Sequence, residues 1–198
     1  MSNEAEFYDD IYRKNPGKWG IDPLRDAVAF FVMSQAGVNN PARLLDYGCG
    51  NGHTIVYLKS KWENTEYCGV DISEVAREIA AQRAPDAEYF EEMPDETYDV
   101  ITVMGVAEHF PDVAAGLRVL GEHLTPGGAL YLEAPNCLAY SQDKTEGFRQ
   151  TYHGSGQMEW HWTWASWEKA IQAAGFKIVR SYDGVVPAWG FIWLLRKE

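Results

Sequence analysis

The sequence predicts an α/β fold, a three-layer sandwich built on a seven-stranded, mostly parallel sheet with an antiparallel last strand. Between residues 43 and 133, short apolar runs typical of buried strands alternate with stretches of helical periodicity, the pattern of right-handed crossovers. A turn with glycine at alternate positions, 48–52, directly follows the first of these strands. With 198 residues, 46% of them hydrophobic, the chain is long enough for one substantial core, and we expect a single domain.

Each element follows from a local pattern. Asp22 can cap a helix that begins at Pro23 and has apolar residues at helical spacing, including Leu24 and Phe31. The alternating region then predicts strands at 43–46, 67–71, 88–90, 98–104 and 129–133, and helices at 53–62, 74–83 and 113–124. Thr163 can cap a last helix that ends at Gly175, and 176–182 and 190–196 are expected to form an antiparallel end.

Four regions are expected within the single domain. Residues 1–40 form an N-terminal helical lid, 41–135 a cofactor-binding core, 136–162 a substrate-cover loop, and 163–198 the last helix with the final two strands. The cover is interpreted as a loop because 136–158 is polar, contains several glycines and has weak periodicity.

Composition excludes several function classes. The formal net charge of −12, without a cluster of Lys and Arg, would repel a phosphate backbone, so we expect no nucleic-acid partner. The three cysteines lack metal-ligand or disulfide spacing, which favours a reduced, cytoplasmic location. No apolar run is long enough to span a bilayer, and the first residues do not have the pattern of a signal peptide, so no membrane association is expected.

Two features predict a nucleotide-like ligand. Glycine has no Cβ, so the turn can adopt positive φ and let a ligand approach the backbone and the N–H groups that open the next helix. Asp71 ends the next strand about 20 residues later, where a carboxylate can accept hydrogen bonds from both hydroxyls of a ribose. The alternative interpretation is that Asp71 only caps the following helix.

The spacing of the turn and the acid before it distinguish between cofactors. The turn reads Gly-x-Gly-x-Gly, whereas dinucleotide sites have Gly-x-Gly-x-x-Gly or Ala. Asp46, just before the turn, would repel a pyrophosphate and attract a cationic or zwitterionic ligand. S-adenosylmethionine, with an ammonium, a sulfonium and a ribose, matches this pattern.

The chain resembles the class I S-adenosylmethionine-dependent methyltransferases, which have a Rossmann-like fold, over nearly its whole length from Arg43 onward. LLDYGCGNG is similar to the first motif of this family, GVDIS to the second, YDVITVMGVAEHF to the fourth-strand motif and LTPGGALYLEAPN to the turn and fifth strand. HWTWASWEKAIQAAGF is similar to the family's His-aromatic-Thr segment and the helix after it. The resemblance implies a methyltransferase with S-adenosylmethionine as the donor and S-adenosylhomocysteine as the product.

The resemblance also implies roles for individual residues. The first motif would wrap the methionine end of the donor, Asp71 would hold the ribose, and Ile72 would lie against the adenine. Either Glu91 or Glu92 would lie near the adenine, and residues Met104 to Val106 would line the floor near the transferred methyl. The expected cofactor-binding residues are Asp46, Gly48, Gly50, Gly52, Asp71, Ile72, Glu92, Met93 and Met104.

The sequence identifies the residues of the acceptor site less specifically than those of the donor site. Methyl transfer requires alignment of donor and acceptor and, for some acceptors, a base, for which His109 and His161 are the candidates. Either histidine could instead have a structural role. No metal is expected, because Met104 replaces the oxygen ligand that catechol-type enzymes place at the end of the fourth strand. The remaining acceptor-site candidates, mostly aromatic, are Tyr8, Tyr12, Trp19, Asn136, Tyr152, His153 and Trp162.

The sequence thus predicts methyl transfer to a small-molecule acceptor, with oxygen favoured over nitrogen because several histidines could act as a base. The protein is expected to be a monomer or a homodimer. Two alternatives stay open: a non-catalytic protein that binds S-adenosylmethionine or S-adenosylhomocysteine, and a nicotinamide-dependent oxidoreductase. Asp46 and the glycine spacing oppose the second alternative.

Overall fold

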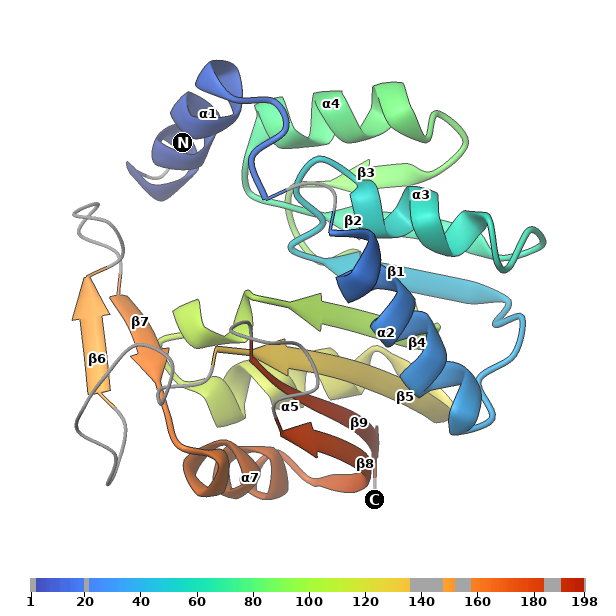
Figure 1. The fold of residues 1–198 in the computed structure, drawn as a ribbon, viewed down its shortest axis with the longest axis vertical. Helices are drawn as coiled ribbons and strands as arrows, with labels where there is room; N and C mark the ends of the chain where they lie inside the picture. Colours follow the sequence, from blue (N-terminus) through green and yellow to red (C-terminus); the bar gives the residue numbers. More distant parts are fainter. Residues whose placement is uncertain (1–2, 20–21, 136–147, 152–157, 184–189, 198) are drawn as a thin grey trace. The chain divides into compact units, whose positions relative to one another are not determined.

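The computed structural model describes residues 3–19, 22–135, 148–151, 158–183 and 190–197 (Figure 1). The chain divides into two compact units, Met1–Thr102 and Val103–Glu198, and the boundary falls inside strand β4 (Tyr98–Met104). The main sheet has seven strands in the order β3-β2-β1-β4-β5-β9-β8. The predicted α/β fold with a seven-stranded sheet is confirmed, and the single-domain organisation stays a prediction.

The first unit contains the parallel part of the sheet. Strand β2 (Glu66–Val70) pairs in parallel with β1 (Arg43–Tyr47) on one side and with β3 (Glu88–Phe90) on the other. Leu44 and Leu45 are both fully buried although they point to opposite faces of β1. Because both faces of this strand are buried, its sequence contains consecutive apolar residues.

Four helices of the first unit form a row in which each contacts the next. In the order α2, α3, α4, α1 they span Pro23–Gln35, His53–Lys59, Glu74–Arg83 and Asn3–Lys14. Helix α3 contacts β2 and helix α4 contacts β3. The predicted cap of α2 is confirmed, because the Asp22 carboxylate accepts hydrogen bonds from the backbone N–H groups of Leu24 and Arg25. Helix α3 ends earlier than expected, at Lys59.

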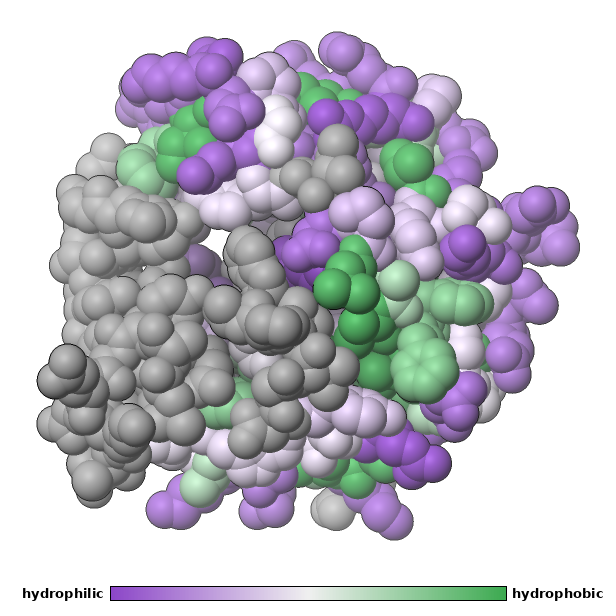
Figure 2. Space-filling model, viewed as in Figure 1, coloured by the Kyte–Doolittle hydropathy of each residue, from purple (hydrophilic) through white to green (hydrophobic). Residues whose placement is uncertain are grey.

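Helix α2 buries only part of the apolar set Leu24, Val28, Phe31 and Val32 that its helical spacing brought together. Ala29, Val32 and Met33 are buried, whereas Leu24 and Phe31 are 57% and 55% exposed. Figure 2 shows hydrophobic side chains at the surface over this helix. Because α2 has apolar residues on more than one side, its periodicity does not specify which side faces the core.

The second unit contains the antiparallel end of the sheet. Strand β9 (Phe191–Lys197) pairs antiparallel with β5 (Leu124–Ala134) and with β8 (Phe176–Asp183), which confirms the predicted antiparallel last strand. Helix α5 (Val113–Glu122) contacts β5, and helix α7 (Trp164–Ala173) contacts β8 and α5. Thr163 caps α7 as predicted: its hydroxyl accepts a hydrogen bond from the backbone N–H of Ser166.

Part of the segment expected to be a loop is a second, two-stranded sheet. Strands β6 (Phe148–Thr151) and β7 (Met158–His161) pair antiparallel. Four-residue strands contain too few alternations for a periodicity signal. The indole N–H of Trp160 donates to the Phe110 carbonyl at 3.1 Å, a contact between residues 50 apart that no local pattern predicts.

We predict that Gly52→Ala destabilises the protein more than Gly37→Ala does. Both glycines have φ near +80°, where a Cβ costs about 1 kcal/mol of strain. A Cβ at Gly52 would also come within 2.9 Å of the Ala80 Cβ, whereas no described atom lies within 4 Å of one at Gly37. Urea unfolding should show an additional loss of about 1–3 kcal/mol for the Gly52 variant. Equal losses would contradict this close approach of α3 and α4.

Candidate functional site

Asp46 is a buried carboxylate at the end of β1. It is 3% exposed, and its Oδ1 accepts a hydrogen bond from the Thr102 hydroxyl at 2.7 Å. Burial raises the pKa of Asp46 to about 7, although the bond from Thr102 opposes this shift. At neutral pH the carboxyl is therefore divided between its acid and ionised forms, and a cation bound nearby would favour the ionised form.

The glycine turn folds over the end of β2. The backbone N–H groups of Gly48 and Cys49 both donate to the Val70 carbonyl, at 2.7 and 2.9 Å. Gly48, Gly50 and Gly52 have φ values of 78°, 51° and 80°, so the predicted need for glycine at these positions is confirmed. The turn thus places its backbone next to the residue that follows β2.

Asp71 follows β2 and bridges the two loops. Its Oδ2 accepts a hydrogen bond from the Gly50 N–H at 2.8 Å, and its Oδ1 accepts one from the Ser73 N–H at 2.9 Å. Burial raises the pKa of this carboxyl, and the two hydrogen bonds lower it. The N-cap of α4 is Ser73, whose hydroxyl accepts from the Ala76 N–H, so the alternative interpretation of Asp71 as the helix cap is wrong.

The other expected cofactor-binding residues of the first unit lie after β2 and β3. Ile72 is 38% exposed, which leaves an apolar surface next to Asp71. Glu92 is exposed and Met93 is half-buried in the segment after β3. Glu91 lies 3.6 Å from the guanidinium of Arg77, and Arg77 donates a hydrogen bond to the Asp71 carbonyl. Of the two glutamates that the sequence left open, Glu91 is connected to the Asp71 loop through Arg77.

Two charged residues near Asp46 were not predicted. The charge of Asp26 raises the pKa of Asp46, and the charge of Arg25 lowers it. Asp26 is buried, and its carboxylate accepts a hydrogen bond from the Thr54 hydroxyl at 3.0 Å. A charged residue on the buried side of an apolar helix was the available signal, but it required knowing which side of α2 is buried.

The second unit holds the candidate bases and part of the candidate acceptor site. Met104, which ends β4, is buried, and His109 is half-buried in the short helix η1 (Ala107–His109), which is separate from α5. His161 ends β7, and its side chain lies outside what the structure describes. Asn136, Tyr152 and His153 lie outside the described residues. The roles of these residues therefore stay predictions.

The tryptophans that the structure describes in the second unit divide into two groups. Trp167 and Trp193 are fully buried, and Trp164 packs on Trp193 with ring centroids 4.8 Å apart, so these rings belong to the core. Trp160 and Trp162 are half-buried, and their centroids are 5.1 Å apart. Because β7 contacts η1, these two rings belong to the same part of the second unit as His109.

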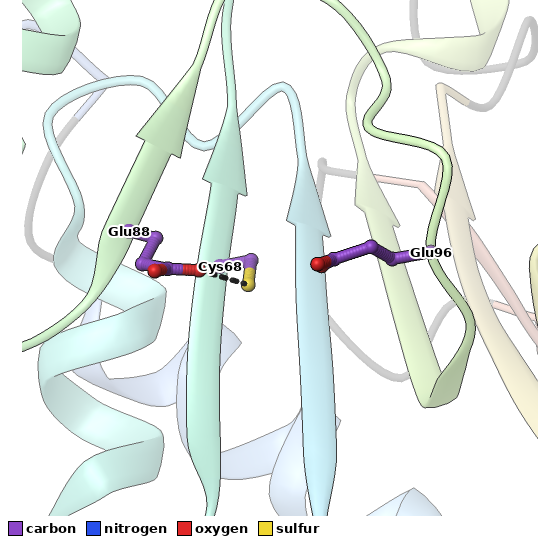
Figure 3. A group of neighbouring side chains, drawn as sticks. All are labelled: Cys68, Glu88 and Glu96. Atoms are coloured by element: carbon purple, nitrogen blue, oxygen red, sulfur yellow. Dashed lines mark hydrogen bonds between the residues drawn. The ribbon is translucent and has the colours of Figure 1, made fainter.

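Cys68, Glu88 and Glu96 form the one group of potential metal ligands found among the described residues (Figure 3). Their ligand atoms lie within 4.8 Å of one another, and the Cys68 thiol is 3.9 Å from Glu88 Oε2. The Arg43 guanidinium lies 2.5 Å from Glu96 Oε2, and the Tyr98 hydroxyl donates to the same oxygen. Since an arginine already neutralises Glu96, this group gives no support for a metal site, and the expected absence of a metal stays a prediction.

Within the described part of the chain, no helix is both long and apolar enough to cross a membrane.

The comparisons with known proteins point to one family. A family model described as a methyltransferase domain matches residues 18–181. A trans-aconitate 2-methyltransferase of Azoarcus is 29% identical over 56% of this chain and 46% of its own length. A demethylmenaquinone methyltransferase of Staphylococcus saprophyticus is 28% identical over 72% of this chain and 66% of its own length. The matched regions therefore span about half to two thirds of these curated relatives.

Solved structures show the same fold at low sequence identity. The 1,6-didemethyltoxoflavin-N1-methyltransferase of Burkholderia thailandensis, solved with bound 1,6-didemethyltoxoflavin and S-adenosylhomocysteine, has a TM-score of 0.76 at 17% identity and covers 99% of this chain and 88% of its own. An amino pentose methyltransferase of Micromonospora echinaspora, solved with S-adenosylmethionine, has a TM-score of 0.67 at 19% identity, with 96% and 97% covered. These likenesses agree with the predicted Rossmann-like fold.

We predict that Asp46→Asn stabilises the protein above neutral pH. The folded state raises the pKa of Asp46 from 3.8 to about 7, so between these values the folded chain holds a proton that the unfolded chain has released. Stability contributed by Asp46 is therefore lost as pH rises from about 4 to about 7 and stays lost above it. The amide oxygen of asparagine can still accept the hydrogen bond from the Thr102 hydroxyl, but the side chain carries no charge.

Urea unfolding at pH 5 and pH 8 tests this. The advantage of Asp46→Asn should increase with pH and reach on the order of 2–4 kcal/mol at pH 8. Parallel pH profiles for the two proteins would show that Asp46 is not titrating as a buried acid.

Proposed function

Because the chain belongs to the family of methyltransferase domains, we propose that it transfers the methyl group of S-adenosylmethionine to a small-molecule acceptor. The observation that supports this most strongly is the pair of carboxylates on either side of the glycine turn, buried Asp46 and half-buried Asp71. Asp46 suits the cationic methionine end of the donor, and Asp71 suits the ribose hydroxyls.

The first unit supplies the donor contacts in this proposal. The glycine turn approaches the methionine part with its backbone, Asp71 accepts from the ribose hydroxyls with the lone pairs that Gly50 and Ser73 leave open, and exposed Ile72 contacts the adenine. Arg25 is a candidate partner for the donor's carboxylate, because its charge already acts on Asp46. Glu91 or Glu92 and Met93 would border the adenine.

The chemistry requires little from the protein beyond alignment and proton removal. A lone pair on the acceptor atom attacks the methyl carbon in line with its bond to sulfur, and that bond's electrons stay on sulfur as S-adenosylhomocysteine leaves. A neutral hydroxyl acceptor gives up its proton during this step, which requires a base. His109 or His161 is the proposed base, with Met104 near the methyl and Trp162 against the acceptor.

The acceptor is proposed as a small molecule, with oxygen favoured over nitrogen. The relatives include enzymes named for either atom: a ubiquinone biosynthesis O-methyltransferase of Yersinia pestis, 29% identical over 59% of this chain and 50% of its own length, and the toxoflavin N1-methyltransferase. Half-buried Trp160 and Trp162 favour a flat or apolar acceptor. We also propose that the enzyme is cytoplasmic, that it uses no metal, and that it is a monomer or a homodimer.

A second candidate function is donor binding without methyl transfer. The [4+2]-cyclase SpnF has the same fold, with a TM-score of 0.68 at 17% identity and 87% of this chain covered. The fold by itself therefore does not define the reaction, and a turnover assay is needed to separate the two functions.

We predict that the wild-type protein binds S-adenosylmethionine and S-adenosylhomocysteine in calorimetry and does not bind NADH. Asp71→Asn should weaken binding of both sulfur ligands at least tenfold, because an amide replaces one carboxylate oxygen that accepts from the ribose. Asp86→Asn, at an exposed aspartate of the same unit, is the control and should bind as wild type. Binding of NADH alone would overturn the proposal in favour of an oxidoreductase.

We predict that His109→Ala lowers kcat at least tenfold with an acceptor that has a hydroxyl group and leaves the affinity for S-adenosylhomocysteine unchanged. His123→Ala, at the end of α5, is the matched control. The assay measures S-adenosylhomocysteine released with a panel of small acceptors. An unaltered kcat would remove His109 from the mechanism, and no product with any acceptor would favour the non-catalytic function.

A further inference from the structure

Helix α1 places an acidic residue on its buried face. Ala5, Asp9 and Tyr12 have the i, i+4, i+7 spacing of one helix face, and all are at most 5% exposed. The neighbouring Asp10 lies on the other side, 57% exposed, within 3.4 Å of Arg13 and Lys14. A buried carboxylate is costly unless its oxygens are hydrogen-bonded, so the partners of Asp9 indicate what it is for.

Arg13, one turn further along α1, lies 3.3 Å from Asp9 Oδ2, and the two partners of Oδ1 lie where α4 begins, just after Asp71. Asp9 Oδ1 accepts a hydrogen bond from the Ser73 hydroxyl at 2.6 Å and another from the Val75 N–H at 3.2 Å. The Ser73 hydroxyl in turn accepts a hydrogen bond from the Ala76 N–H, so Asp9 and Ser73 together cap α4. A carboxylate at a helix N-terminus is favourable, because unpaired N–H groups meet it there. Helix α1 is thereby attached to the residues next to the proposed ribose ligand.

A second attachment lies on the glycine turn. The buried Asn51 side chain donates to the carbonyls of Pro16 and Lys18, at 3.0 and 3.3 Å. Between the two attachments, a Cβ at Gly50 would lie 2.6 Å from the Tyr12 hydroxyl oxygen. Residues 3–19 therefore contact both the glycine turn and the loop after β2, at positions next to the residues proposed to bind the donor (Figure 1).

We propose that Asp9 is a positioning residue for the donor: by capping α4 from α1, it fixes the Asp71 loop and fastens residues 3–19 over the donor site. This inference rests on the proposed function. The donor enters while this segment is detached and is retained when Asp9 and Asn51 attach it. By linkage, a bound donor stabilises the attachment as much as the attachment stabilises the donor. Asp9 acts through Ser73 and contacts no substrate itself.

The test compares Asp9→Ala with Asp10→Ala, a matched loss of a carboxylate on the exposed side of the same helix. Stopped-flow displacement should show S-adenosylhomocysteine dissociating about tenfold faster from the Asp9 variant and at the wild-type rate from the Asp10 variant. The KM for S-adenosylmethionine should rise similarly, while kcat at saturating donor changes less than about twofold. A purely structural role would not separate KM from kcat in this way.

Limited trypsin digestion gives an independent readout, because Arg13, Lys14 and Lys18 lie within the segment. S-adenosylhomocysteine should slow cleavage at these residues in wild type and much less in Asp9→Ala. Asp9→Asn keeps Oδ1 as an acceptor, so S-adenosylhomocysteine should dissociate from it more slowly than from Asp9→Ala. This variant replaces Asp9→Ala in the test if the alanine variant does not fold.

Two outcomes contradict the inference in different ways. Wild-type dissociation rates and protection in the Asp9 variants, in a protein that binds S-adenosylhomocysteine, would overturn the positioning role alone. No binding by the wild-type protein would overturn the proposed function on which it rests.

Discussion

The two hydrogen bonds accepted by the Asp71 carboxylate organise the first unit. One oxygen binds the Gly50 N–H in the turn after β1, and the other binds the Ser73 N–H in the loop after β2. Because both strands are parallel neighbours, their carboxyl ends meet at one edge of the sheet, and a single side chain can join the loops. The left-handed glycines, the cap of α4 and the attachment of α1 all lie beside this junction.

The cost of this arrangement is a concentration of carboxylates that are buried or half-buried. Asp9, Asp26, Asp46 and Asp71 belong to the same unit, and the charges of Asp9 and Asp26 raise the pKa of Asp71 and Asp46. Such a group is unfavourable in an empty protein and favourable once a cation neutralises part of it. The proposed donor carries a sulfonium and an ammonium, so its binding would offset part of this cost.

The parts of the fold predicted from sequence are those with a local cause. The glycine turn needs positive φ, Asp22 and Thr163 cap helices next to them, and the alternation of strands and helices specifies the sheet. Asp9, Asn51 and Asp26 could not be assigned, because the partners that join them to other elements lie between 28 and 66 residues away. Strands β6 and β7 were missed for a different reason: each is too short to show a periodicity.

If Asp46 belongs to a site for a cationic donor, as proposed, binding of the donor should release protons from its carboxyl group. Calorimetric titration with S-adenosylmethionine at pH 7, in two buffers of different ionisation enthalpy, measures the protons released. Since Asp46 has a pKa of about 7 and a bound cation would ionise it, about half a proton should be released by wild type and none by Asp46→Asn. Equal release by both proteins, or proton uptake by the wild type, would show that Asp46 does not bind the cationic part of the donor.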